Sequence, residues 1–431
     1  MSSMEQILKL SGEFIDCLDE MEQGSANLFI TGKAGTGKST LLDLFRRSTS
    51  KNIVVLAPTG IAALRIQGQT IHSFFKFPPR LILASDIQLK PGLLGLVRKL
   101  EILVLDEISM VRADILDGIN RMLQLHRKSN LPFGGVRLIV FGDIYQLPPI
   151  VNSIEEKQFF STEYGSPYFF SSHIWRSLEN IHFISLSTIY RQTDRRFIRL
   201  LDDIRHGIVD YDTLEELNHR VDEAFEEHGY IHLSPRNSTM QRINQRKLDE
   251  LEGEERSYLS VITGEYNAQF APTDPILKLK VGAQVIFVRN DPERIFVNGT
   301  IGTITILDNN SITVRIVPDG KEVTVTRASW DMVRYKLDEN DNGKIKPEVV
   351  GSFEQFPLKL AWAMSIHKSQ GQTFDRVILD MEGGAFEFGQ TYVALSRCRT
   401  LEGIVLKRPL KPRDIMVDQR VVDFYFDHFR G

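Results

Sequence analysis

Eight residues near the amino end combine glycines, two lysines and two hydroxyl groups at a spacing that suits phosphate binding. They run from Gly32 to Ser39, read GKAGTGKS and follow an apolar stretch. Glycines let backbone N–H groups point at phosphate oxygens, the Lys38 ammonium reaches the β and γ phosphates, and the Ser39 hydroxyl takes Mg²⁺. The pattern predicts a site for ATP and Mg²⁺ built from Gly35, Thr36, Gly37, Lys38, Ser39 and Thr40.

Two adjacent acids, Asp106 and Glu107, follow the apolar run at 101–105. Acids at the end of a buried strand are costly unless they bind something. We therefore expect Asp106 to hold Mg²⁺ through water, as a second metal residue beside Ser39, and Glu107 to polarise the attacking water. Farther along, the Gln146 amide is placed in the sequence like one that contacts the γ-phosphate and the water.

The residues around Gln146 make the pattern more specific. The pair Asp-Glu followed by GDIYQLPP at 142–149 resembles superfamily-one helicases rather than nucleotide kinases or small GTPases. Further segments match motifs of that group in order: APTGIAA at 57–63, GQTIHSF at 68–74, YRQ at 190–192, IHKSQGQT at 366–373 and YVALSR at 392–397. The segment from Phe169 through Trp175 to Leu178 is similar to the signature of the Pif-one family, in the branch that also holds RecD-type enzymes.

This resemblance implies catalytic roles for two arginines. Arg191 and Arg397 lie in motifs of the second motor unit, across a cleft from Lys38, and a guanidinium aimed at the γ-phosphate stabilises transition-state charge. The alternative for either residue is a structural arginine. The expected catalytic set is Lys38, Glu107, Gln146, Arg191 and Arg397.

The resemblance also implies a channel for a single DNA strand. The motif residues that line it in the family are here Thr59, Gly60, His72, Ser73, His367, Lys368 and Ser369. Either histidine could instead be satisfied in the core, and Phe74, Phe75 and Phe77 could stack on bases or pack in the core. The run at 77–80, FPPR, is expected to be rigid and exposed, and it resembles the place of the family's strand-separating wedge.

One departure concerns the adenine base. The family usually has a glutamine before the phosphate loop that reads adenine, and Phe14 and Asp16 stand about where it is expected. Gln6 and Gln23 are the remaining candidates in this region.

Composition limits the class of protein. With 431 residues the chain has room for two to four domains, and its net charge of −4 means that nucleic acid must bind a local basic track. Cys17 and Cys398 are too few for a disulfide framework or a four-ligand zinc site. We find no apolar run long enough to cross a bilayer and no basic leader, so the cytoplasm is expected if the chain is bacterial.

The elements that must position these residues are α/β. Apolar runs at 27–31, 52–57, 101–105 and 137–141 alternate with helical patterns, and a second set lies at 183–187, 230–233, 376–380 and 403–406. Between about 263 and 349 the period changes to two, with tight turns at 308–310 and 318–320. We expect two RecA-like parallel-sheet motor domains, at 1–186 with a wedge insert near 64–90 and at 187–262 plus 350–431, and a small antiparallel barrel at 263–349 in the second.

The family resemblance implies that this barrel is Src-homology-three-like. Its cations either face DNA or form a solvated mixed face; they are Lys278, Lys280, Arg289 and Arg294. The chain is thus expected to be an ATP-dependent helicase that moves 5′ to 3′ on single-stranded DNA and unwinds duplex or fork DNA, as a monomer when free. A DNA-stimulated ATPase that remodels nucleoprotein complexes is the alternative. A phosphate-loop kinase is a third class, which the second motor unit argues against.

Overall fold

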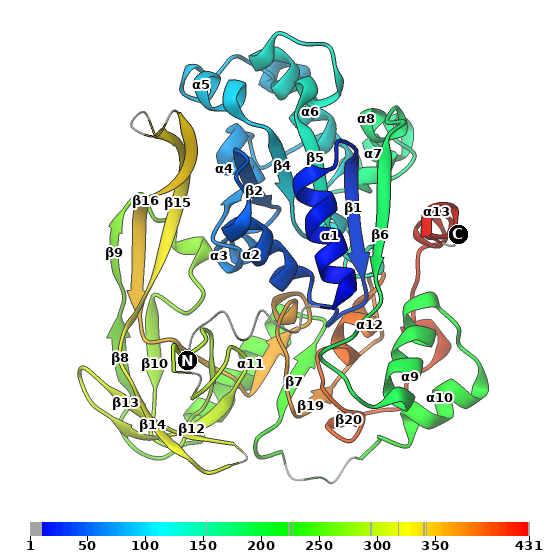
Figure 1. Ribbon diagram of the computed structural model, residues 1–431. Coiled ribbons are helices and arrows are strands. Elements are labelled where there is room, and N and C mark those ends of the chain that lie inside the picture. The colour runs from blue at the N-terminus through cyan, green and yellow to red at the C-terminus, as the bar shows by residue number, and fades with distance from the viewer. Residues whose placement is uncertain are drawn as a thin grey trace.

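Two parallel sheets and a group of antiparallel sheets make up the protein (Figure 1). The computed structural model describes residues 11–429, apart from 152, 223, 224, 226, 294, 318, 339, 340 and 342. No helix among these residues has both the length and the apolar character to cross a bilayer. The α/β class and its two RecA-like sheets are as predicted.

The first lobe holds a parallel sheet of six strands in the order β3-β2-β4-β5-β1-β6. Its strands are β1 (Asn27–Gly32), β2 (Ile53–Ala57), β3 (Gln69–Thr70), β4 (Ile102–Leu105), β5 (Arg137–Phe141) and β6 (Ile181–Leu186). β2 and β4 are buried along their whole length, as expected for strands covered on both faces. The run at 183–187, assigned above to the second set, belongs to β6, which pairs with β1 of this first sheet.

Helices cover both faces of this sheet. They are α1 (Gly12–Gln23), α2 (Lys38–Ser48), α3 (Gly60–Arg65), α4 (Ile71–Phe75), α5 (Pro91–Lys99), α6 (Ala113–Arg127), α7 (Ile154–Glu163) and α8 (His173–Arg176). α1, β2 and α2 share one apolar cluster, whereas α4, α5 and α6 pack into the large cluster on the other face. The carboxyl ends of β1, β4 and β5 therefore meet at one edge, where ligands bind in open α/β sheets.

The second lobe has a four-stranded parallel sheet in the order β18-β7-β19-β20. Its strands are β7 (Ile231–Ser234), β18 (Ala363–Ser365), β19 (Val377–Leu379) and β20 (Ile404–Leu406). Its helices are α9 (Arg195–His206), α10 (Tyr211–Asn218), α11 (Asn237–Asp249) and α12 (Gln390–Leu395). The acidic helix α10 ends at Asn218, and residues 223, 224 and 226 beyond it lie outside the described residues.

Antiparallel strands fill the chain between β7 and β18. They are β8 (Arg256–Leu259), β9 (Val261–Gly264), β10 (Ile276–Leu279), β11 (Gln284–Phe287), β12 (Ile301–Leu307), β13 (Ile312–Ile316), β14 (Glu322–Val325), β15 (Ala328–Asp338), β16 (Lys344–Gln355) and β17 (Leu358–Leu360). The sheet β14-β13-β12-β11-β17 and the pair β10-β8 enclose one apolar core. The predicted turn at 308–310 joins β12 to β13, and β13 pairs antiparallel with β14, while residue 318 of the second predicted turn lies outside the described residues. These strands extend beyond 263–349 on both sides.

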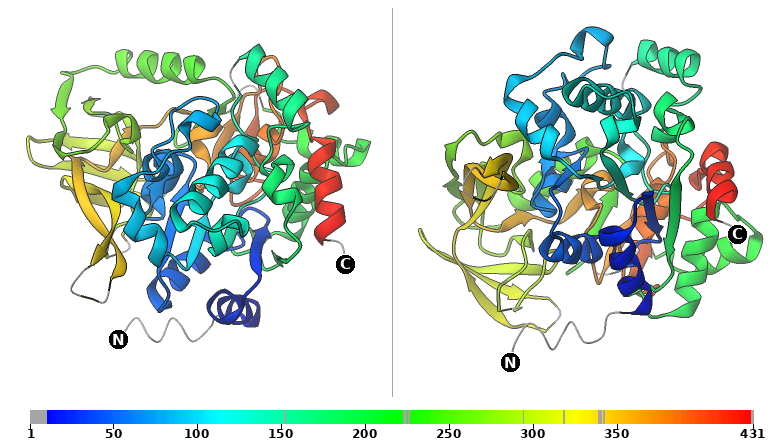
Figure 2. Two further views of the ribbon diagram at one scale, coloured as in Figure 1. Left: turned by 90° about the horizontal axis from the view of Figure 1, so that it is seen from above. Right: turned by 45° about the horizontal axis from the view of Figure 1, so that its top comes forward.

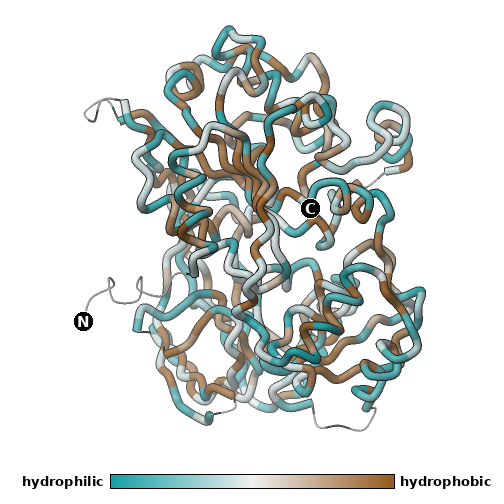
Figure 3. Tube along the Cα trace, turned by 45° about the vertical axis from the view of Figure 1, so that its right-hand side comes forward, coloured by the Kyte–Doolittle hydropathy of each residue, from teal (hydrophilic) through white to brown (hydrophobic). Residues whose placement is uncertain are grey.

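Two segments connect these parts across space. The long hairpin β15–β16 lies beside the first lobe, where the Tyr335 hydroxyl accepts a hydrogen bond from the Val55 N–H at 3.1 Å (Figures 1 and 2). The last helix, α13 (Gln419–Phe429), returns to the first lobe, and its Phe424 ring stacks on Phe170 at 4.6 Å. Apolar residues of both lobes belong to one large core cluster, and Figure 3 shows apolar stretches in both lobes. Because Phe424 also packs on Phe169, the aromatic signature segment serves as the docking surface for the chain's last helix.

Candidate active site and nucleic-acid interface

The predicted phosphate loop lies between β1 and α2, as its pattern requires. Gly35 and Gly37 have φ of +88° and +82°, which favours glycine over any residue with a Cβ. A Cβ on Gly35 would also lie 2.5 Å from the Cβ of Arg191, so the loop passes directly against the second lobe. The Gly35 carbonyl accepts a hydrogen bond from the Tyr190 N–H at 2.9 Å, which fixes this approach.

Lys38 is the first residue of α2, and its ammonium points back into the loop. Its Nζ donates to the carbonyl oxygens of Gly32 at 2.5 Å and Lys33 at 3.1 Å. Burial lowers the pKa of Lys38 below its ordinary value, although Asp143 and Glu107 oppose that shift. A buried cation of this kind is stabilised by a bound polyanion such as a triphosphate.

Asp106 and Glu107 lie where β4 ends, facing the loop. Glu107 has φ of +51°, a strained backbone conformation for a residue with a Cβ and one that is found often at functional sites. Burial, with a further contribution from Glu107, raises the pKa of Asp106 to about 6. The Asp106 Oδ2 atom is buried and accepts no hydrogen bond from any described residue, so a cation ligand fits it.

The two predicted arginines reach the same place from the second lobe. The Arg191 Nη1 donates to the carbonyl of Ser396 at 3.1 Å, and the Arg397 Nε donates to the carbonyl of Val393 at 2.9 Å. Burial lowers the pKa of Arg397 to about 10, and burial together with Arg397 lowers that of Arg191 to about 9. The charge of Arg397 thus opposes that of Arg191, and a bound anion would relieve this repulsion.

A pocket with a volume of about 470 Å³ collects these groups. All six predicted phosphate-loop residues line it, together with Glu107, Gln146, Arg191 and Arg397. Two further arginines that the sequence analysis did not name, Arg65 and Arg399, also line it. The structure therefore brings the whole expected catalytic set to one cleft between the lobes, with Asp106 buried at its edge.

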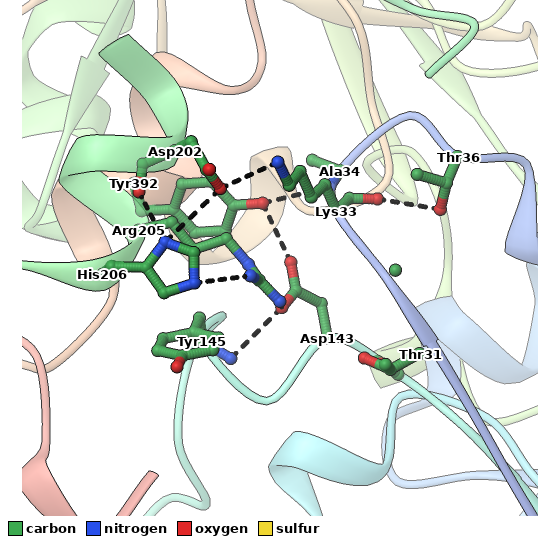
Figure 4. A network of polar contacts seen from close by, with 12 residues as sticks. Thr31, Lys33, Ala34, Thr36, Asp143, Tyr145, Asp202, Arg205, His206 and Tyr392 are labelled. Atoms are coloured by element: carbon green, nitrogen blue, oxygen red, sulfur yellow. Dashed lines mark hydrogen bonds and ion pairs between the residues drawn. The ribbon is translucent and has the colours of Figure 1, made fainter. Parts of the chain in front are cut away.

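A buried polar network joins the lobes beside this pocket (Figure 4). The Asp143 carboxylate accepts from the Tyr392 hydroxyl at 2.9 Å and forms an ion pair with Arg205 at 3.1 Å. The Tyr392 hydroxyl accepts in turn from the Ala34 N–H of the phosphate loop at 3.0 Å. Burial alone would raise the pKa of Asp143, but Arg205 and Lys38 hold it below its ordinary value. The phosphate loop is thus held by a residue of the second lobe.

The wall near the loop also offers an aromatic face. Tyr190 lines the pocket with about 54% of its surface exposed, and its ring meets Phe14 edge to face at 5.9 Å. Phe14 lies under the loop, because a Cβ on Gly37 would approach its ring to 2.8 Å. Gln23 ends α1, away from the pocket lining, and Gln6 lies outside the described residues. The neighbourhood of Phe14 thus holds an aromatic pair in place of the expected glutamine.

The strand-binding candidates of the first lobe lie on α3 and α4. Thr59 caps α3 by accepting the Ala62 N–H at 3.3 Å, and the Ser73 hydroxyl accepts from the Gln69 amide at 2.9 Å. His72 is partly buried, and burial together with Arg112 lowers its pKa. Gly60 is covered by the antiparallel insert between β7 and β18, since a Cβ there would lie 2.2 Å from the ring of Phe270.

The strand-binding candidates of the second lobe border a groove with a volume of about 1000 Å³. His367 and Lys368 line it, and the His367 Nε2 lies 2.8 Å from the Glu387 carboxylate. Ser369 does not line it; its hydroxyl is buried and donates to the Ile366 carbonyl at 2.7 Å. Two residues that the sequence analysis missed, Arg236 and the 55%-exposed Phe386, supply a cation and an aromatic face in the same groove.

The role of three phenylalanines, which the sequence left open, resolves toward packing. Phe74, Phe75 and Phe77 are all buried, and the last two stack on each other at 5.4 Å, so they are core residues. In the wedge run the exposed residues are therefore Pro79 and Arg80, and Arg80 pairs with Asp86 at 2.7 Å.

Among the barrel cations, Lys278 pairs with Glu255, while Lys280 and Arg289 donate to backbone carbonyls at 2.9 Å and 2.8 Å. These contacts favour the solvated mixed face over a DNA-facing role for the three cations. Arg294 lies outside the described residues.

Sequence comparisons match the chain to known families. The model for PIF1-like helicase matches residues 13–214, and the model for the 2B domain of DNA helicase Pif1 matches residues 266–307. The chain is 36% identical to the ATP-dependent DNA helicase Pif1 of Bdellovibrio bacteriovorus over 428 residues, covering 97% of this chain and 92% of that protein. The chain belongs to the Pif1 helicase family. The resemblance of its motifs is thereby confirmed.

Solved structures of this family agree with the fold. The crystal structure of Bacteroides sp Pif1 in complex with ADP-AlF4 matches with a TM-score of 0.90 at 38% identity, covering 98% of each chain. Bacteroides Pif1 bound to ssDNA matches with a TM-score of 0.69 at 39% identity, covering 97% of each chain. Unliganded Pif1 from Bacteroides sp matches with a TM-score of 0.89, so at nearly equal identity this Pif1-family chain shares more of its overall arrangement with these two structures than with the complex with ssDNA.

Proposed function

We propose that this chain is an ATP-dependent DNA helicase that moves 5′ to 3′ on single-stranded DNA. The observation that carries the proposal is the cleft itself, where Lys38 and Glu107 of the first lobe meet Arg191 and Arg397 of the second in one pocket. A phosphate-loop kinase needs no second RecA-like lobe to complete its site. Here the charge that stabilises γ-phosphate transfer comes partly from the second lobe, so hydrolysis depends on how the two lobes sit relative to each other.

Within the cleft, each residue has a task that its chemistry supports. Lys38 and the loop N–H groups bind the phosphates, Glu107 takes a proton from the attacking water, and the Gln146 amide orients that water. Ser39 and Asp106 would hold Mg²⁺, which offsets phosphate charge when bound. Tyr190 offers a stacking face for the adenine ring, because it is the exposed aromatic residue beside the loop.

The DNA strand is proposed to run across both lobes, along the strand-binding candidates described above. Thr59, Gly60, His72 and Ser73 would contact it from the first lobe, and His367 and Lys368 from the second, while Ser369 shapes the turn that presents them. Phe270 covers Gly60, so a strand that reaches Gly60 must displace the insert. The exposed run at 79–80 is proposed as the wedge that meets duplex or fork DNA.

The division into 1–186, 187–262 plus 350–431, and 263–349 is proposed as the domain organisation, with the strands of the insert reaching from Arg256 to Leu360. The monomer is proposed as the free state. Movement 5′ to 3′ rests on the family resemblance and not on the geometry of the cleft.

Unwinding of two duplexes that differ only in tail polarity tests the proposal, with ATP and Mg²⁺ present. Opening of the 5′-tailed duplex alone is expected. Opening of the 3′-tailed duplex alone would overturn the polarity, and ATP hydrolysis stimulated by the strand without opening of either duplex would favour the remodelling ATPase.

A further inference from the structure

Arg65, the last residue of α3, reaches into the nucleotide pocket although it belongs to none of the chemical motifs above. Its Nη2 donates to the Ser39 hydroxyl at 2.9 Å and to the Glu107 carboxylate at 3.3 Å. The same nitrogen lies 3.9 Å from the Asp106 carboxylate. One guanidinium therefore contacts the hydroxyl and the two acids that surround the proposed metal position.

A metal ion and this guanidinium compete for the same oxygen atoms. Mg²⁺ binds oxygen at about 2.1 Å, so an ion on Ser39 Oγ would lie within about 5 Å of Nη2, the sum of that length and 2.9 Å. Like charges at this separation repel strongly in a partly buried site. Arg65 must therefore withdraw before Ser39 and Asp106 can hold the metal.

The position of Arg65 in the fold connects it to both proposed strand contacts. α3 begins at Gly60 and is capped by Thr59, and its six residues span only about 9 Å. At the other end, the Arg65 guanidinium lies against Gly371 of the second lobe, where a Cβ would meet Nη1 at 1.6 Å. Gly371 follows Ser369 by two residues. The guanidinium thus lies between two segments that are proposed to hold the strand.

We propose that the Arg65 guanidinium blocks the metal site until a DNA strand is bound. A strand that contacts Thr59 and Gly60 moves α3, and one that contacts His367 and Lys368 moves the turn that carries Gly371. Either movement withdraws the guanidinium from Ser39 and the two acids. Metal binding, and with it hydrolysis, then becomes dependent on the strand. The proposal rests on the proposed function, because it requires both a nucleotide site and a strand site.

Direct measurement of metal binding tests this without measuring turnover. Mn²⁺ binding is followed by electron paramagnetic resonance in the presence of a non-hydrolysable ATP analogue, with and without a thymidine oligonucleotide. In the unmodified protein, the oligonucleotide is expected to lower the Mn²⁺ concentration at half-saturation by about tenfold, within the usual range for coupled sites. In Arg65→Ala that concentration is expected to be low already and to change little when the oligonucleotide is added.

Two further variants make the result specific. Arg46→Ala removes an arginine that also bonds near the end of α3, to Gln67, but lies outside the pocket lining, and it should behave like the unmodified protein. Arg65→Gln keeps much of the side chain's bulk, so it reports on charge if the alanine variant folds poorly.

Half-saturation in Arg65→Gln equal to or higher than that of the unmodified protein, with the oligonucleotide effect retained, would overturn the proposal. If the unmodified protein binds no ATP analogue at all, the proposed function fails instead.

Discussion

Tyr392→Phe removes one oxygen atom from the network that joins the lobes, and its effect can be worked out from the contacts. The hydroxyl donates to the buried Asp143 carboxylate and accepts from the buried Ala34 N–H. A hydrogen bond to a charged group contributes about 1.5–3 kcal/mol, and a buried donor left without a partner costs about 1–3 kcal/mol. Because neighbours relax, we expect the free energy of unfolding to fall by about 2–4 kcal/mol in total.

Urea denaturation measures this change. For a slope of about 3 kcal/mol per molar urea, a loss of 3 kcal/mol moves the midpoint of the transition down by about 1 M. ATP affinity should fall as well, because Ala34 belongs to the phosphate loop. Tyr425→Phe is the matched control, since it keeps the ring that stacks on the Arg205 guanidinium at 5.1 Å. A change below about 0.5 kcal/mol in Tyr392→Phe, equal to that of the control, would refute the reasoning.

Three further outcomes are expected. Lys38→Ala should abolish ATP hydrolysis while strand binding measured by fluorescence anisotropy persists, since Lys38 lines the nucleotide pocket and not the groove beside His367. Full ATP hydrolysis in this variant would refute the phosphate-loop assignment. Arg397→Ala should lower kcat by about 10³-fold with little change in nucleotide Kd, and a defect in folding alone would contradict its role. Burial raises the pKa of Asp106 to about 6, so its ionisation destabilises the folded protein, and the free energy of unfolding should fall as pH rises from about 4 through 6. Because metal binds the ionised carboxylate, the Mn²⁺ concentration at half-saturation should rise by up to about tenfold per pH unit below 6, and Asp106→Asn should remove that slope.

The sequence predicts which first-lobe residues line the cleft because their patterns are local, whereas Arg191 and Arg397 were expected there only from the family resemblance. The phosphate loop needs glycines at the positions where φ is positive, and the paired acids must follow a buried strand, so both leave marks in a short stretch of chain. The parallel strands are predictable for a similar reason, since burial on both faces gives continuous apolar runs. The strand at 183–187 shows the limit, because its pattern cannot say which of two sheets it joins.

Residues that act across space escaped this kind of prediction. Arg205 is a buried arginine on an amphipathic helix, and only the fold reveals that it faces Asp143, 62 residues away in the chain. Phe386 and Arg236 come together from different segments to line one groove. The phenylalanines at 74, 75 and 77 were ambiguous because a core ring and a stacking ring have the same type and spacing. Their burial decides between the two roles.

The cleft contains more positive charge than a phosphate loop requires. Lys38, Arg65, Arg191 and Arg397 all line it, and burial lowers the pKa of three of them. Without an anion, such a cluster opposes closure of the lobes; with a triphosphate, the same charges favour it. After the γ-phosphate leaves, part of that attraction is lost and the second-lobe arginines again repel each other. Under the proposed function, electrostatic repulsion within the site would drive reopening, so that each ATP would close and then release the two lobes proposed to hold the strand.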